Sequence, residues 1–310
     1  MTPLRDLIER RSGPLVMGVV NRTPDSFSDG GAMLDDGAAL AAVDAMIAAG
    51  ATIVDVGAES TRPGAPPISD AEQIGRLGGV VRAIADKGVV VSIDTTSTAV
   101  AERALADGAS VVNSVSLDAA APLAAVAARA GASLVLMHCR GAMKDMRGFS
   151  TYPEDGYGDV VADVAREWWD AASRALEAMP REDLVLDPGL GFAKSARHSL
   201  ELTARLDELI ALGFPVLAGP SRKSFLARAV AADASAALPG PRDRLGATIA
   251  ACLACARAGA AILRVHDVAA VTQALAFEVA LARVRAQSPA QGDASRGASP
   301  QRTQGGAARA

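Results

Sequence analysis

The chain has 310 residues, of which 50% are hydrophobic and 21% are charged, so it can bury a large core. Its 31 basic and 35 acidic residues give a net charge of −4, which argues against a general nucleic-acid-binding surface. Residues 1–13 are polar, and the apolar run 15–20 is too short for a signal peptide or a membrane span. Together with an odd number of cysteines, three, these features predict a cytoplasmic protein with no membrane partner.

Short apolar runs rich in β-branched residues alternate with longer amphipathic stretches of helical period along the chain. Continuous apolar runs are typical of parallel strands that are buried on both faces. A series of such strand and helix units without a break in composition predicts an α/β fold, a single-domain (β/α)₈ TIM barrel over residues 15–286. A doubly wound open sheet is the alternative, because sequence cannot show closure. The predicted strands are 15–20, 52–56, 89–93, 110–112, 133–137, 184–186, 215–218 and 261–265.

The remaining segments carry local signals. The capping-box pattern Ser69-Asp70-Ala71-Glu72 predicts a helix that begins at Asp70. Cys252 and Cys255 lie in an Ala-rich helical stretch, which favours two buried helical residues over a redox or zinc motif. Residues 1–14 precede the barrel as a lead-in. Residues 287–310 lack an apolar period, and their composition predicts a disordered tail outside the function.

A polar or charged residue stands at or just beyond the end of each predicted strand. Turn preferences explain one such residue, but not a set that covers all the strands. A barrel gathers these positions on its C-terminal face, where barrel enzymes keep their active sites. Carboxylates and amides suit the edge of an aminopyrimidinone ring, while cationic groups suit phosphate. The set comprises Asn21, Asp55, Asp94, Asn113, His138, Asp187, the turn 219–224 with Arg222 and Lys223, Arg264 and His266.

Six motifs occur in a fixed order along the chain. They are VMGVVNRTPDSFSDGG (16–31), GAESTRPGA (57–65), SIDT (92–95), DPGLGF (187–192), SRKS (221–224) and RVHDV (264–268). From about residue 15 to 281 the chain resembles the dihydropteroate synthases. The resemblance implies a Mg²⁺-dependent transferase of folate biosynthesis that joins 6-hydroxymethyl-7,8-dihydropterin pyrophosphate to p-aminobenzoate. It also implies that pyrophosphate leaves before the amine attacks, that sulfonamides target the enzyme, and that the protein is a homodimer through its outer helices.

The resemblance also implies a role for individual residues toward the pterin and its diphosphate. The pterin would be held by Asp94, Asn113, Asp187 and Lys223, with Met137 packed on the ring face. A plain core role for Met137 is the open alternative. Asn21 would be the metal-site residue, with the diphosphate supplying most of the oxygen ligands of Mg²⁺. The diphosphate itself would be bound by Asn21, Thr61, Arg264 and His266.

The second substrate and the chemistry would involve further residues in this resemblance. The p-aminobenzoate site would comprise Phe27, Arg62, Pro63, Arg222, Lys223 and Ser224, although Arg222 also fits a solvated surface arginine. The catalytic set would comprise Asp187, Lys223, Asp29 and Arg62. Asp187 would face the developing pterin cation, and Asp29 would take up the amine proton or accompany the departing pyrophosphate.

The chain departs from the family pattern at a few positions, and three other interpretations of its function stay open. Arg22, Ala58 and Cys139-Arg140 replace the usual residues, the stretch 149–157 is unusually aromatic, and His198 is predicted to be a surface helix residue. A methyltetrahydrofolate:corrinoid methyltransferase would share the barrel and the pterin carboxylates, but would not need residues 60–63 or 221–224. A non-catalytic pterin-binding homologue is the other alternative, and a nucleic-acid scaffold has only the tail arginines in its favour.

Overall fold

The computed structural model describes residues 3–22, 35–60, 64–141, 145–146, 148–231 and 237–287. Its strands are all parallel and form one sheet of eight in the order β6-β5-β4-β3-β2-β1-β8-β7. A parallel bridge between Leu186 and Val216 joins the two ends of that order, so the sheet closes. The predicted TIM barrel is confirmed. The strands are β1 (Leu15–Asn21), β2 (Ile53–Gly57), β3 (Val90–Asp94), β4 (Val111–Ser114), β5 (Ser133–Met137), β6 (Leu184–Asp187), β7 (Leu217–Ala218) and β8 (Ile262–Val265).

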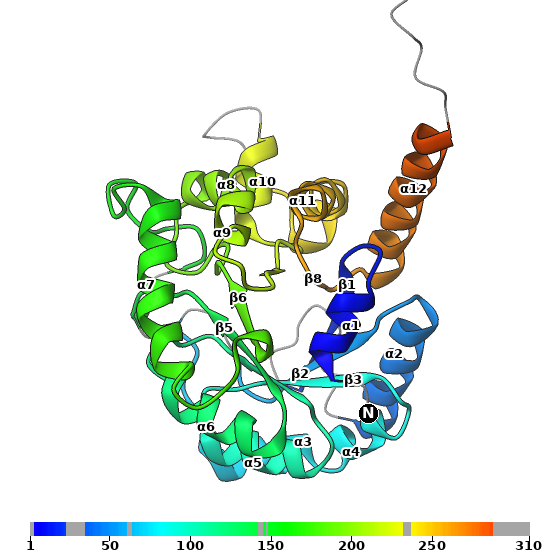
Figure 1. Ribbon diagram of the computed structural model, residues 1–310, viewed down its shortest axis with the longest axis vertical. Helices are drawn as coiled ribbons and strands as arrows, with labels where there is room; N and C mark the ends of the chain where they lie inside the picture. The colour runs from blue at the N-terminus through cyan, green and yellow to red at the C-terminus, as the bar shows by residue number, and fades with distance from the viewer. Residues whose placement is uncertain are drawn as a thin grey trace, which may run out of the picture.

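Helices fill the connections between successive strands and surround the barrel (Figure 1). The last helix follows β8, and one short helix precedes β1. They are α1 (Leu4–Arg10), α2 (Asp36–Ala48), α3 (Asp70–Leu77), α4 (Val80–Ala85), α5 (Thr98–Ala106), α6 (Ala120–Ala130), α7 (Val160–Ala175), α8 (Ala196–Ala204), α9 (Leu206–Ile210), α10 (Ser224–Val230), α11 (Leu245–Ala258) and α12 (Val268–Gln287), with 3₁₀ turns η3 (Arg181–Asp183) and η4 (Pro241–Arg244).

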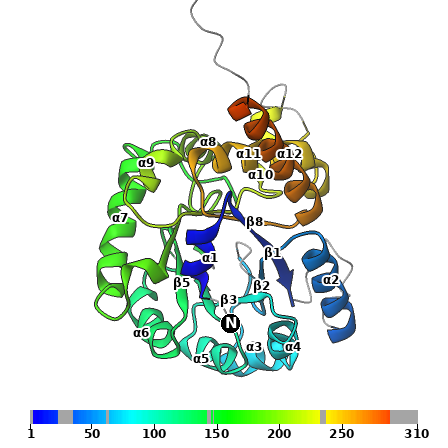
Figure 2. The same ribbon diagram turned by 45° about the vertical axis from the view of Figure 1, so that its right-hand side comes forward.

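The core has two layers because each strand is buried on both faces. The outer layer fills the space between strands and helices. The inner layer fills the barrel itself with at least one side chain from each of the eight strands, among them Met17, Val90 and Val185. Helix α1 lies across the N-terminal end of the barrel, as Figure 2 shows, and inserts Leu4 into this inner layer. The lead-in segment therefore covers one end of the barrel and leaves the opposite end for the site.

The start of α3 and the burial of the two helical cysteines agree with the sequence predictions, whereas the position of His198 does not. The side chain of Ser69 accepts a hydrogen bond from the Glu72 amide, and α3 begins at Asp70 as predicted. Cys252 and Cys255 are fully buried in α11, which confirms the reading as helical core residues. The prediction for His198 is wrong: its ring is buried because Nδ1 accepts from the Ser195 amide and completes a capping box at the start of α8.

The chain ends of the described part also bear on the predictions. Helix α12 continues to Gln287, one residue into the predicted tail, and the rest of that tail lies outside the described residues. Among the helices described, none combines the length and the apolar character that a membrane crossing requires.

Candidate functional site

Three strands, β1, β3 and β4, bring polar side chains to the same level of the barrel. Strand pairing aligns Asn21 with Gly57, Gly57 with Asp94, and Asp94 with Asn113. Residues in register across a parallel sheet point to the same face, so the side chains of Asn21, Asp94 and Asn113 share one side. Gly57 carries no side chain at this level, and a Cβ there would lie 3.5 Å from Asn21 Oδ1 and 3.8 Å from Asp94 Oδ2. These side chains lie at the C-terminal end of the barrel, where the predicted pterin and metal residues meet.

A charged network crosses the barrel beneath this row. Arg264 donates from Nε to Asp55 Oδ2 at 2.7 Å and from Nη2 to Asp94 Oδ2 at 3.2 Å. Asn113 donates from Nδ2 to the same Asp55 oxygen at 3.1 Å. Burial and the neighbouring charge of Asp55 raise the pKa of Asp94 above its usual range. The network fixes the Asn113 amide and the Asp94 carboxylate, and leaves both beside the opening.

Asp187 ends β6 on the other side of the opening. Its Oδ1 accepts a hydrogen bond from the Gly189 amide at 2.7 Å. Burial raises the pKa of Asp187, while the nearby positive charge of Lys223 opposes the rise. Lys223 lies in the turn after β7, and burial lowers its pKa to about 8. Its Nζ is 4.6 Å from the centroid of the Phe192 ring. A carboxylate, an ammonium group and an aromatic face therefore meet at this point.

The turn after β7 is tied to the end of β8. Ser221 Oγ lies 3.2 Å from His266 Nδ1 and accepts from the His266 amide. Burial, together with the positive charge of Arg264, lowers the pKa of His266 to about 3, so the ring is neutral near pH 7. The Arg222 guanidinium makes a bidentate ion pair with Asp267, from Nη2 to Oδ1 at 2.6 Å and from Nε to Oδ2 at 2.9 Å. Arg222 is partly buried in this pair, so the alternative of a fully solvated arginine is wrong.

The aromatic stretch after β5, which had no predicted role, packs against the segments after β6 and β7. Phe149 meets Phe192 edge to face with ring centroids 5.2 Å apart, and Tyr157 donates from its hydroxyl to the Ala193 carbonyl. Ser224 donates its hydroxyl to Ser150 Oγ at 2.9 Å. The stretch therefore forms one wall beside Ser224.

The departures at Arg22 and Arg140 are explained by contacts with neighbouring helices. Arg22 donates from Nε to the Arg76 carbonyl at 2.6 Å and pairs with Asp36, so it joins the end of β1 to α2 and α3. Arg140 pairs with Glu167 of α7 and stacks on the Tyr157 ring, 3.8 Å from its centroid. Arg140 thereby anchors the aromatic stretch to α7.

Sequence reasoning missed one buried charged residue near the site. Lys194 is fully buried and donates to His138 Nδ1 at 3.0 Å and to the Phe192 carbonyl at 3.1 Å. The His138 ring contacts Glu167 through Nε2 at 3.0 Å. His138 carried a signal, because it follows a strand. Lys194 follows a glycine-rich turn and resembles a surface lysine in sequence, so no signal for its burial was available.

Met137 ends β5 in a small buried apolar cluster with Cys139, Phe192 and Ala193, a location compatible with both of its predicted roles. No group of three or more His, Cys, Asp or Glu side chains that could hold a metal occurs within the described ranges. The predicted site residues Phe27, Asp29, Thr61, Arg62 and Pro63 lie outside the described residues.

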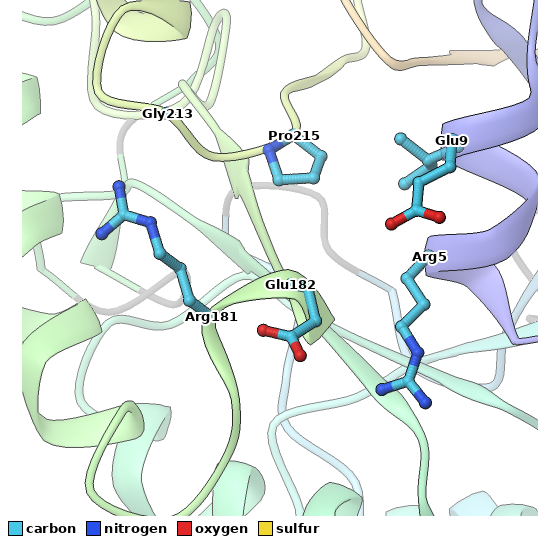
Figure 3. Close-up of a pocket in the computed structure, with 7 residues that line it drawn as sticks. Arg5, Glu9, Arg181, Glu182, Gly213 and Pro215 are labelled. Carbon is cyan, nitrogen blue, oxygen red and sulfur yellow. The ribbon is translucent and has the colours of Figure 1, made fainter.

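A cavity of about 240 Å³ lies at the opposite end of the barrel. Figure 3 shows Arg5 and Glu9 of α1 facing Arg181, Glu182 and Pro215, which come just before β6 and β7. The Arg181 guanidinium stacks on Phe214, 3.7 Å from the ring centroid, and donates to the Leu212 carbonyl. Because these residues precede the strands, the cavity belongs to the end that stabilises the barrel and not to the polar face.

A parallel barrel whose C-terminal face gathers buried carboxylates, an amide and two cations defines a class of enzyme that binds a polar ring and an anion. The sequence profile of the pterin binding enzyme family matches residues 17–266. The dihydropteroate synthase of Mycobacterium leprae is 45% identical over 263 residues, which are 84% of this chain and 90% of that protein. The chain therefore belongs to the pterin-binding enzymes and, among them, to the dihydropteroate synthase family.

Solved structures agree with this membership. The Yersinia pestis dihydropteroate synthase in complex with a sulfonamide drug is 35% identical, with a TM-score of 0.78 and coverage of 88% of this chain and 95% of that one. The Thermus thermophilus enzyme in complex with 4-aminobenzoate is 38% identical, with a TM-score of 0.74 and coverage of 87% and 95%.

Proposed function

We propose that this chain catalyses the dihydropteroate synthase reaction. The amine nitrogen of p-aminobenzoate forms a bond to the pterin methylene carbon, the bond from that carbon to the diphosphate oxygen breaks, and the amine loses a proton. Pyrophosphate and 7,8-dihydropteroate are the products. The observation that carries the proposal is the charged network of Asp55, Asp94, Asn113 and Arg264 facing Asp187 and Lys223 across one barrel opening.

The pterin is assigned to this opening. The Asp94 and Asp187 carboxylates and the Asn113 amide provide the acceptors and donors that match an aminopyrimidinone edge. A departing diphosphate leaves positive charge on the pterin, and a fixed carboxylate nearby stabilises that charge as it develops. Asp187 is held by Gly189 in this position. Asp187 and Lys223 are accordingly the two described catalytic residues of the proposal.

The diphosphate is assigned to the cationic side of the opening, with Arg264 and His266 as ligands. Mg²⁺ prefers hard oxygen ligands and often retains several substrate oxygens and waters, so a single amide oxygen from the protein suits it. The Asn21 amide oxygen, beside Asp94 across Gly57, fits this description. When bound, Mg²⁺ would neutralise charge on the leaving diphosphate. Thr61 is proposed as a further diphosphate ligand.

The p-aminobenzoate is assigned to the gap beside Ser224 and Lys223. Ser224 begins α10, and its hydroxyl already makes hydrogen bonds to Phe149 and Ser150. A carboxylate at this point would accept from the Ser224 hydroxyl in place of the Phe149 carbonyl or the Ser150 hydroxyl, while the stem of Lys223 packs on the ring. Phe27, Arg62, Pro63 and Arg222 complete the proposed site, with Asp29 and Arg62 as additional catalytic groups.

The assembly and location of the protein are also proposed. We assign it to the cytoplasm, as a homodimer that forms through outer helices. The apolar Phe277 and Val284 of α12 are 64% and 62% exposed, and a partner surface would cover them. Light scattering of the purified protein measures the mass directly, and a monomer at micromolar concentration would contradict the dimer.

Pyrophosphate release by the purified protein with Mg²⁺ and the pterin pyrophosphate tests the function. The expected result is release that depends on p-aminobenzoate, with a product of dihydropteroate mass. Pterin binding without turnover would indicate a non-catalytic homologue, and methyl transfer to cobalamin would indicate the corrinoid methyltransferase. Either result would overturn the proposal.

A further inference from the structure

Lys194 is a fully buried lysine that the proposed reaction does not use. It follows the turn 188–193 after β6, and its Nζ reaches three acceptors. These are His138 Nδ1 at 3.0 Å, the Phe192 carbonyl at 3.1 Å and the His138 carbonyl at 3.3 Å. Burying an ammonium group costs free energy unless its N–H donors are all hydrogen-bonded. The three hydrogen bonds of Lys194 therefore indicate a specific structural role.

The protons in this cluster can be assigned from its acceptors. A lysine ammonium has three N–H donors, and Lys194 faces three acceptors, so these hydrogen bonds favour the charged form, while burial lowers the pKa of Lys194 to about 7. Burial lowers the pKa of His138 to about 4, so the imidazole is neutral. Its Nδ1 accepts from Lys194, and its Nε2 therefore carries the proton and donates to Glu167 at 3.0 Å. Lys194, His138 and Glu167 form one hydrogen-bonded chain from the turn to α7.

The same cluster encloses the glycine that holds Asp187. Gly189 has a φ of +66°, and a Cβ there would overlap the His138 carbonyl oxygen and lie 3.3 Å from Lys194 Nζ. The Gly189 amide donates to Asp187 Oδ1 at 2.7 Å, and the His138 amide donates to the Asp187 carbonyl at 2.9 Å. Lys194 therefore supports both segments that fix the position of Asp187.

We propose that Lys194 is a positioning residue for Asp187, acting by joining the His138 carbonyl to the Phe192 carbonyl and so holding the turn 188–193 in place. The inference rests on the proposed function in one respect, since it takes Asp187 to be a pterin ligand. Lys194 itself is fully buried and is not one of the residues assigned to a substrate. A positioning residue of this kind acts through the geometry of its neighbour, as partners behind the primary ligands do at other sites.

Lys194→Met keeps the length of the side chain and removes its donors, and hydrogen exchange of the turn reports its position. We expect amide exchange in 187–193 to become about tenfold faster, and 6-hydroxymethylpterin to bind about tenfold more weakly by calorimetry. Exchange in β1 and β2 should not change. Lys194→Gln, which keeps an N–H donor of similar reach, should show the same faster exchange in 187–193 with a smaller amplitude. This variant replaces Lys194→Met in the test if the methionine variant does not fold.

Arg140→Met is the matched control, because it breaks the Glu167 pair on the outer side of the cluster and leaves the bonds of Lys194 intact. It should accelerate exchange in 149–157 and not in 187–193. Unchanged exchange in 187–193 of Lys194→Met, or equal acceleration throughout the barrel, would overturn the inference. Wild-type protein that releases no pyrophosphate would contradict the proposed function instead, and the exchange result would still decide the role of Lys194.

Discussion

Arg264 on β8 donates a hydrogen bond of 2.7 Å to Asp55 on β2, which lies 209 positions earlier in the sequence. The same Asp55 oxygen accepts from Asn113 of β4, so one carboxylate fixes two side chains of the proposed pterin and diphosphate sites. Asp55 is fully buried, and among the described residues its other oxygen has no hydrogen-bond partner. Its role is therefore to hold other groups and to balance the charge of Arg264.

Asp55→Asn should lower the free energy of unfolding by about 3 kcal/mol, because Arg264 loses the nearer of its two carboxylate partners. Urea unfolding measures the loss. Asp44→Asn is the control, since Asp44 pairs with Lys87 on the surface and its side chain is 60% exposed. That variant should lose less than about 0.5 kcal/mol. An Asp55→Asn loss as small as the control's would show that the buried pair does not stabilise the fold.

The strands and the polar residues at their ends could be predicted from sequence because both follow from local rules. Apolar runs indicate buried parallel strands, and each observed strand overlaps its predicted range. Asp94 and Asp187 end their strands as predicted, and barrel geometry alone brings strand ends to one face. The register that aligns Asn21, Gly57 and Asp94 adds a detail that only the structure provides.

The supporting contacts could not be predicted, because they depend on which distant side chains meet. Glu167 in α7 and Lys194 in a turn are ordinary residues in sequence. Their pairing with His138 appears only when α7 packs beside β5 and the turn after β6 folds over the end of β5. The burial of His198 likewise requires the Glu154 carbonyl, 44 positions away. Periodicity reports which face of an element is buried, but not the partners of a polar side chain on it.

Asp187→Asn preserves the shape of the side chain and removes its charge. Its turnover number should fall by about 100-fold or more, because a fixed negative charge no longer stabilises the pterin cation. The KM for p-aminobenzoate should change by less than about threefold, since that substrate is assigned to the gap beside Ser224 and not to the Asp187 carboxylate. Steady-state kinetics with both substrates separate the two effects. Wild-type turnover in this variant would exclude the proposed role.

Sulfonamides should compete with p-aminobenzoate for the gap beside Ser224. A sulfonamide has an aniline ring and replaces the carboxylate with a sulfonyl group, whose oxygens would accept from the same hydroxyl. The expected pattern is a rise in apparent KM for p-aminobenzoate with an unchanged maximal rate. Lack of inhibition at a large excess over substrate, or a fall in maximal rate alone, would place p-aminobenzoate elsewhere.

Deletion of residues 288–310 should leave turnover and both KM values unchanged within about twofold. The deletion begins after Gln287, so it preserves all of α12. A matched truncation that also removes the last turn of α12 should lower the free energy of unfolding while turnover is still unchanged. A change in KM caused by the shorter deletion would instead assign the tail to the site.

The charge of Lys223 should set the alkaline limit of the reaction. Burial lowers its pKa to about 8, so the ammonium form exists below that pH and is lost above it. Because the pterin pyrophosphate is an anion, we expect kcat/KM for it to fall as pH rises through about 8. Burial and the positive charge of Arg264 keep His266 neutral near this pH, since its pKa is lowered to about 3, so His266 does not cause the fall.

Lys223→Arg separates this group from others that titrate nearby, because a guanidinium stays protonated far above pH 8. The variant should be slower overall, since the guanidinium group does not reproduce the position of the ammonium group. The pH above which its kcat/KM falls should nevertheless rise by at least about one unit. If kcat/KM of the arginine variant still falls near pH 8, the titration belongs to another group or to the substrate. A shift of this decline to higher pH would show that the positive charge of Lys223 itself, and not only the shape of its side chain, supports binding of the anionic pterin pyrophosphate.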